Sequence, residues 1–116
     1  MNSKYFKRAE FKCHCDECHC DTLDYELLCV LHELREHFGV PIHIMSGHRC
    51  LKHNRSVGSK DTSQHVQGRA ADIMVKDVDP QKVYDTLCEW YPHKYGVGNY
   101  DTFTHIDTRT NGPARW

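Results

Sequence analysis

The spacing of apolar residues predicts an amphipathic helix over residues 23–38. Asp21 or Thr22 is expected to cap its start, because their side-chain oxygens can accept from backbone N–H groups left free in the first turn. Gly39 and Pro41 are typical of a helix end. The apolar side chains recur at intervals of three and four positions and form one stripe: Leu23, Leu27, Val30, Leu31, Leu34 and Phe38.

A second amphipathic helix is predicted over residues 80–91. Asp79 is its expected N-cap, and Pro80 suits the first helical position because that residue needs no intrahelical N–H donor. Pro92 then stops the helix. Its apolar face consists of Val83, Leu87, Trp90 and Tyr91. We interpret both apolar stripes as core.

Short strands are predicted between and after the helices. They cover residues 42–45, 70–75, 95–100 and 103–108, each bounded by Gly, Pro, Asp or Asn. Helices and strands mix without regular βαβ alternation, so we expect an α+β fold with a small, mainly antiparallel sheet packed with two principal helices. The length of 116 residues, without repeats or low-complexity segments, indicates a single domain over residues 1–116.

Composition places the chain among ordinary globular proteins, with 39% hydrophobic and 27% charged residues. The 15 Lys and Arg residues nearly balance the 16 Asp and Glu residues, so charge gives no basis for binding nucleic acid or an acidic membrane. No apolar run approaches the roughly 18 residues of a membrane span, so no membrane insertion is expected. Residues 1–12 lack the apolar core of a secretory signal, which predicts synthesis in the cytoplasm without a signal peptide. We expect the chain to act as a monomer.

Ten His and seven Cys are unusual for this length and make metal binding the first chemistry to consider. His65, Asp72 and His105 would offer two imidazoles and one carboxylate, and three protein ligands with an open position are typical of catalytic zinc. Gly68 suits a turn after His65, while Asp72 and His105 are expected on neighbouring strands. The alternative is that each His is a surface or hydrogen-bonded core residue, and spacing alone does not decide between the two.

A longer set of residues follows the order and spacing of one enzyme family. The set comprises Ser46-Gly47-His48-Arg49, Asn54, Val57-Gly58, Ser63, His65, Gly68, Ala70, Asp72, Gly96-Val97-Gly98, His105 and Asp107. With this set the chain resembles the M15 zinc peptidases, in the branch of D-alanyl-D-alanine carboxypeptidases and endopeptidases that includes many phage lysins. The resemblance covers nearly the whole chain, from about Phe6 to Trp116.

The resemblance implies that His65, Asp72 and His105 hold Zn²⁺ and that the fold is like that of hedgehog domains and D-Ala-D-Ala peptidases. It implies hydrolysis of D-alanine-containing peptide bonds in peptidoglycan stem peptides or cross-links. The bacterial cell wall, reached after release, is then the site of action. The alternative is a binding module of the same fold that keeps the metal but not turnover, as in hedgehog signalling domains.

Two positions depart from the family pattern. His48 stands where the family usually has Tyr, which implies altered substrate contacts, and Thr102 stands where some relatives have a catalytic Glu. Asp107 is therefore a candidate general base, since it would share a strand face with His105. The alternative role for Asp107 is to orient a ligand imidazole, and Asp101 is the competing base.

The resemblance also implies that Arg49, His48 and Ser63 contact the substrate. Arg49 stays protonated and cannot be a base, but its planar guanidinium can bind a carboxylate through two hydrogen bonds or stabilise an oxyanion during catalysis. The alternative for Arg49 is a surface side chain paired with a nearby carboxylate, which would contribute little to stability.

A cysteine-rich N-terminal loop spans residues 13–20 and could enclose a tetrahedral structural ion, since cysteines two apart do not easily bridge each other. Its cysteines are Cys13, Cys15, Cys18 and Cys20. A reduced loop, or a thiol packing against or bridging to Cys50, stays open, because relatives often carry cysteines near both places. A small cysteine-rich regulatory zinc protein would instead bind metal here and none at His65.

Overall fold

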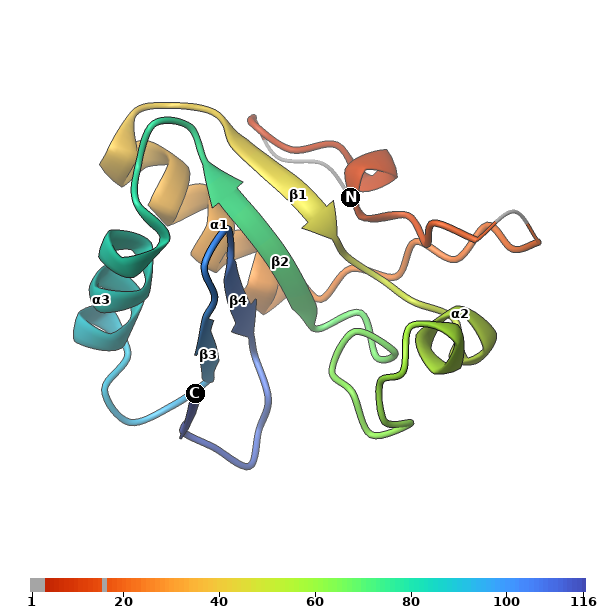
Figure 1. Cartoon of the computed structure of the whole chain (residues 1–116). Coiled ribbons are helices and arrows are strands. Elements are labelled where there is room, and N and C mark those ends of the chain that lie inside the picture. Colours follow the sequence, from red (N-terminus) through yellow and green to blue (C-terminus); the bar gives the residue numbers. More distant parts are fainter. Residues whose placement is uncertain (1–3, 16) are drawn as a thin grey trace.

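The structure is a computed structural model that describes residues 4–15 and 17–116 (Figure 1). Within these residues the fold is α+β, as the sequence predicts, and no helix is both long and apolar enough to span a bilayer. The elements in chain order are η1 (Arg8–Phe11), α1 (Tyr25–Phe38), β1 (Ile42–Ser46), α2 (Leu51–Ser56), β2 (Ala70–Val75), α3 (Pro80–Trp90), β3 (Gly96–Asn99), β4 (Thr104–Asp107) and β5 (Ala114–Arg115).

The strands form one sheet in the order β1-β2-β4-β3-β5. Neighbouring strands are antiparallel except β3 and β5, which run parallel. The first four strands are those that the sequence predicts, and their ends differ from the predicted ends by no more than one residue. The fifth has only two residues, too short a run for an apolar pattern to reveal it.

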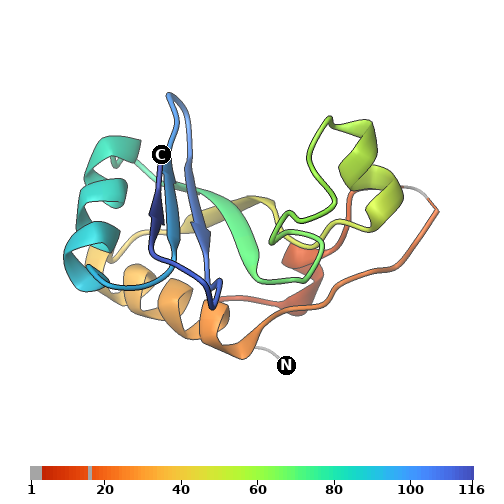
Figure 2. The same cartoon turned by 90° about the horizontal axis from the view of Figure 1, so that it is seen from below.

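Alternation along the strands separates a core face from a polar face. Ile73, Val97 and Ile106 share the hydrophobic core with the apolar stripes of α1 and α3. Because successive side chains of a strand point to opposite faces, Asp72 and His105 lie on the other side of the sheet. The short helix α2 lies at the end of the molecule opposite to α3 (Figures 1 and 2).

The first long helix begins later than predicted, and its cap is Asp24 rather than Asp21 or Thr22. The Asp24 carboxylate accepts a backbone N–H of the first turn at 3.2 Å and the hydroxyl of Thr108 at 2.6 Å. Asp21 instead lies beside Arg8, with the Arg8 Nε atom 3.4 Å from its carboxylate. A tertiary contact thus selects the cap, which local sequence does not reveal.

The start of α3 agrees with the prediction, whereas α2 is absent from it. Asp79 caps α3 by accepting the Gln81 N–H at 2.9 Å, and Pro80 is the first helical residue. The six residues of α2 carry no apolar stripe, and its N-cap is a thiol: Cys50 Sγ accepts the His53 N–H at 3.4 Å. Neither feature is a recognised helix signal in the sequence.

The segment before α1 packs across the connection from β1 to α2. Phe11 is buried, and its carbonyl oxygen accepts a hydrogen bond from the His48 N–H at 2.8 Å. Gly47 lies directly against this segment, since a Cβ atom there would be 2.7 Å from Phe11 Cα. Gly68, with φ of 73°, packs equally closely on the Thr22 carbonyl oxygen. The N-terminal segment therefore supports the backbone that leads to the polar face.

Replacing Gly47 with Ala should destabilise the fold by about 1–3 kcal/mol, because the added methyl meets backbone atoms of Phe11 that cannot rotate away. Urea unfolding measures this change in the free energy of unfolding. Ser56→Ala, at an exposed position in α2, is the matched control and should change it by no more than about 0.5 kcal/mol. Equal stability of the Gly47→Ala protein and the wild type would contradict the close packing of Gly47 against Phe11.

Candidate metal centre

Two strands and a turn bring His65, Asp72 and His105 together. Asp72 in β2 lies opposite His105 in β4, as the sequence predicts, and His65 comes from the turn that precedes β2. Asp72 Oδ1 lies 2.9 Å from His105 Nδ1, and Asp72 Oδ2 lies 3.4 Å from His65 Nε2. One potential ligand atom of each residue lies within 4.8 Å of the other two, so the three can share a single ion.

Each imidazole is oriented by a partner at its other nitrogen. His65 Nδ1 lies 2.8 Å from the Gly47 carbonyl oxygen, which only accepts, so His65 carries a proton at Nδ1. His105 Nε2 donates to Asp107 Oδ2 at 2.7 Å. His65 Nε2 and His105 Nδ1 are thereby directed toward Asp72. Such hydrogen bonds at the non-ligating nitrogen are usual for histidines that bind metals.

Burial and charge in this cluster suit a bound cation. Burial alone would raise the pKa of Asp72, but hydrogen bonds from His105 and His65 outweigh it and hold that pKa below its usual range. Burial alone would lower the pKa of His105, but the carboxylates of Asp107 and Asp72 raise it. Two imidazole nitrogens and a carboxylate oxygen, all nearly buried, form a donor set that fits zinc.

Asp107 is fully buried and bound on both oxygens. Arg109 donates to it twice from its guanidinium, from Nε and from Nη2, each at 2.8 Å, and once from its backbone N–H at 3.1 Å. Burial alone would raise the pKa of Asp107, but the hydrogen bonds from Arg109 and His105 hold it below its usual range. Of the two roles that the sequence leaves open, this geometry favours orienting His105 over acting as a base.

A cavity of about 520 Å³ opens over the cluster, and Arg49, Ser63 and Trp116 contribute to its walls. Among the described side chains that line it, those of Asp72 and Asp107 are the only carboxylates. The competing base of the sequence analysis, Asp101, lies outside: together with Thr102 it lines a separate hollow beside α3. The structure therefore does not bring Asp101 to the metal centre.

Arg49 reaches this cavity and contacts a metal-ligand candidate. Its Nη2 lies 3.4 Å from Asp72 Oδ2, while Nε and Nη1 donate to Ser46 Oγ and Asn54 Oδ1, each at 3.2 Å. Asn54 is itself fully buried and donates to the Lys60 carbonyl oxygen. The Arg49 side chain is only 15% exposed, so it is not the surface arginine of the alternative interpretation. These contacts use one N–H of each nitrogen, and Nη1 and Nη2 each carry a second.

The other two substrate-contact candidates behave differently. Ser63 lines the cavity, and its hydroxyl oxygen accepts the His65 N–H at 3.2 Å. His48 does not line it, which corrects the expectation of a substrate contact. Its Nδ1 accepts the Thr22 N–H at 3.0 Å, and Nε2 donates to the Val66 carbonyl oxygen at 3.1 Å. Both ring nitrogens of His48 thus join backbone segments behind the site.

Trp116 forms a wall of the cavity that the sequence analysis does not identify. Its ring centroid lies 5.0 Å from that of His105, and its Nε1 donates to the Tyr100 hydroxyl at 2.7 Å. Gly98 in β3 provides the space, since a Cβ atom there would lie 2.6 Å from the indole nitrogen. The sequence held only a weak signal for this wall: Gly96 and Gly98 within a predicted strand, and Trp116 as an aromatic residue outside both apolar stripes.

The cysteines form a second group, in which Cys50 replaces Cys20 of the predicted ligand set; the packing of loop thiols against Cys50 that the sequence left open is present, without a disulfide. Cys13, Cys15 and Cys18 lie together with Cys50, while Cys20 is outside the group. The Cys20 carbonyl oxygen accepts the Cys13 N–H at 2.7 Å and so closes the base of the loop. The connection from β1 to α2 then carries Cys50 to the place expected for Cys20.

Comparison with known protein families confirms the family resemblance seen in the sequence. The chain matches the family described as Peptidase M15 over residues 4–107, a span that contains all three candidate metal ligands. No individual curated protein matches the chain.

Replacing Asp107 with Asn should lower the stability of the metal-free protein at neutral pH by roughly 2–3 kcal/mol, because Arg109 loses a buried counter-charge. Since folding lowers the pKa of Asp107, its contribution is complete above the unfolded pKa of about 3.9 and declines as the pH falls below it. The difference from the wild type should therefore shrink on acidification in urea-unfolding series. The exposed control Asp101→Asn should show no such difference. If the stability difference between the Asp107→Asn protein and the wild type does not change with pH, the ion pair is contradicted.

Proposed function

The chain belongs to the M15 peptidase family, and on this premise we propose that it is a zinc-dependent metallopeptidase acting on peptidoglycan. The proposed reaction is hydrolysis of D-alanine-containing peptide bonds in stem peptides or cross-links of the bacterial cell wall. The observation that carries the proposal is the convergence of His65, Asp72 and His105 at the cavity, with each imidazole oriented by a further hydrogen bond.

His65, Asp72 and His105 would hold the zinc ion, which supplies a Lewis acid for the peptide carbonyl and activates water as the nucleophile. The protein's own contribution is to fix these ligands. Gly47 fixes the His65 ring through its carbonyl oxygen, and Asp107 fixes the His105 ring through its carboxylate. Replacing such a partner usually weakens metal binding even though the ligands themselves are unchanged.

The charges around the cavity favour a substrate that carries a carboxylate. Arg49, Lys60 and Arg109 all line it, and Arg49 is held by three contacts with N–H groups to spare. A planar guanidinium can bind a carboxylate through two hydrogen bonds or stabilise the oxyanion that forms when the peptide carbonyl is attacked. Trp116 offers an apolar surface for the rest of the peptide and shields His105 from solvent.

A second function, metal-retaining binding without turnover, is favoured by one observation. Both side-chain carboxylates that line the cavity within the described residues are engaged, Asp72 with the imidazoles and Asp107 with Arg109. A hydrolase needs a group that accepts a proton from water and passes it to the leaving amine. Unless Asp72 or a substrate group serves that role, the site would bind the peptide and leave it intact.

Digestion of purified muropeptides, followed by mass spectrometry, tests the proposal and separates the two functions. The zinc-loaded chain should release D-alanine or open cross-links, chelator should abolish this, and added zinc should restore it. His65→Ala should be inactive because it removes one metal ligand. Peptide binding without new products would support the binding module, and the absence of both binding and cleavage would contradict the assignment to peptidoglycan.

Arg49→Lys should fold and retain zinc but lose about 100- to 1,000-fold in kcat/KM, because an ammonium keeps the charge without the two-pronged geometry. Arg49→Ala should lose at least as much. Arg55→Lys, which alters an exposed ion pair with Asp61, is the matched control and should leave kcat/KM unchanged. Near-normal turnover by the Arg49→Lys protein would mean that charge alone matters at this position.

A further inference from the structure

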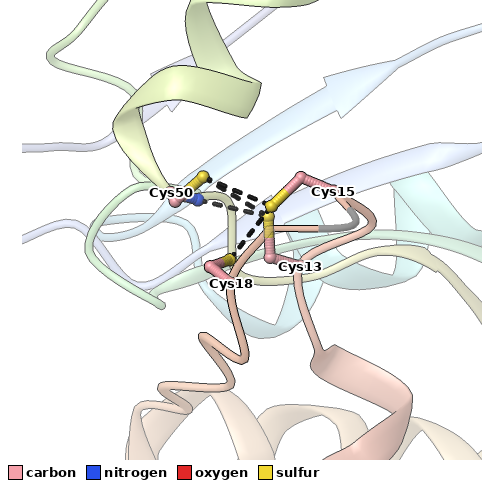
Figure 3. Close-up of side chains that lie close together, drawn as sticks. All are labelled: Cys13, Cys15, Cys18 and Cys50. Carbon is pink, nitrogen blue, oxygen red and sulfur yellow. Dashed lines mark hydrogen bonds between the residues drawn. The ribbon is translucent and has the colours of Figure 1, made fainter.

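We propose that Cys13, Cys15, Cys18 and Cys50 form a structural zinc site, separate from the centre at His65. Figure 3 shows the four side chains converging, three from the N-terminal loop and Cys50 from the start of α2. One sulfur of each lies within 4.8 Å of the other three. Four thiolates around one ion are a closed, four-coordinate set, which is typical of structural rather than catalytic zinc.

Two of the distances between sulfur atoms match those around a tetrahedral ion, and a third is shorter. A Zn–S bond of about 2.3 Å places neighbouring sulfur atoms of a regular tetrahedron about 3.8 Å apart. Cys50 Sγ lies 3.8 Å from Cys13 Sγ and 3.7 Å from Cys15 Sγ, and Cys15 Sγ lies 3.1 Å from Cys18 Sγ. All are well beyond the disulfide length of about 2.05 Å, and none of the seven cysteines in the described residues is in a disulfide.

Backbone N–H groups already point at two of the sulfur atoms. The Cys50 N–H donates to Cys13 Sγ and the His53 N–H donates to Cys50 Sγ, each at 3.4 Å. Hydrogen bonds of this kind stabilise the charged thiolate that a metal requires. Lys52, two positions after Cys50, pairs with Glu17 and so provides a second, exposed contact between α2 and the N-terminal loop.

The position of the group indicates what the metal would do. Cys50 directly follows Arg49, and the same connection carries Gly47, whose carbonyl oxygen orients His65. A zinc ion would tie this connection to the N-terminal loop across 37 positions of sequence, beside the existing hydrogen bond from His48 to Phe11. Metal at the cysteines would therefore hold Arg49 and Gly47 in place from behind the cavity. Closing a loop of this length by metal also reduces the entropy of the unfolded chain.

Metal content measured in a His65→Ala background isolates the proposed site from the first centre. That protein should retain one zinc per chain after dialysis, and Cys50→Ser or Cys18→Ser in addition should lose it. Cys20→Ser is the matched control, since Cys20 belongs to the same run but lies outside the group, and should keep the metal. Retention by the Cys50→Ser protein, or loss by the Cys20→Ser protein, would overturn the assignment of the four ligands.

Cobalt substitution of the His65→Ala protein gives a second, spectroscopic readout of the same site. Bound Co²⁺ should show intense thiolate-to-metal absorption and the visible bands of a tetrahedral ion. Cys18→His should preserve tetrahedral cobalt with weaker thiolate absorption, whereas Cys18→Ser should not. A cobalt spectrum without thiolate bands, or an intact mass two hydrogens lower that indicates a disulfide, would overturn the proposal whether or not the protein cleaves peptides.

Discussion

The backbone of residues 47–49 is the constraint on which the metal centre depends. Gly47 gives its carbonyl oxygen to the His65 ring, and the Arg49 N–H donates to the His65 carbonyl oxygen at 3.0 Å. On the other side, Phe11 accepts the His48 N–H and leaves no room for a side chain at position 47. A shift of this connection would move the His65 imidazole and the Arg49 guanidinium together. The positions of both groups therefore depend on how this connection packs against Phe11.

A series of alternating charges crosses the polar face of the sheet. Arg49 lies beside Asp72, Asp72 beside His105, His105 beside Asp107, and Asp107 beside Arg109. Each member is mostly buried, and each has a partner of opposite charge when the imidazole is protonated. Buried charges are tolerated only when paired in this way. The series restrains the rotamers of its own five members before any metal binds.

The sequence predicts the helices and strands that have a periodic apolar pattern. It predicts fewer of the features that depend on contacts between distant segments. Apolar periodicity located α1, α3 and four strands, and the family pattern supplied the trio around Asp72. It could not show that both ring nitrogens of His48 would bond to backbone groups, or that Cys50 would take the place of Cys20 in the cysteine group, because both depend on segments far apart in the chain. The helix α2 and the Trp116 wall were missed for the same reason: neither forms an apolar stripe, and packing decides both.

The fit between Gly98 and Trp116 couples two positions that lie far apart along the chain. Because a methyl at position 98 would occupy the space of the indole, the two residues cannot vary independently. A larger residue at position 98 would need a smaller one at position 116, a turned indole ring, or a last strand moved away from β3. Divergence of this wall should therefore proceed in paired steps. The shape of this wall therefore depends on two positions, neither of which is among the metal-ligand candidates in β2, β4 and the turn before β2.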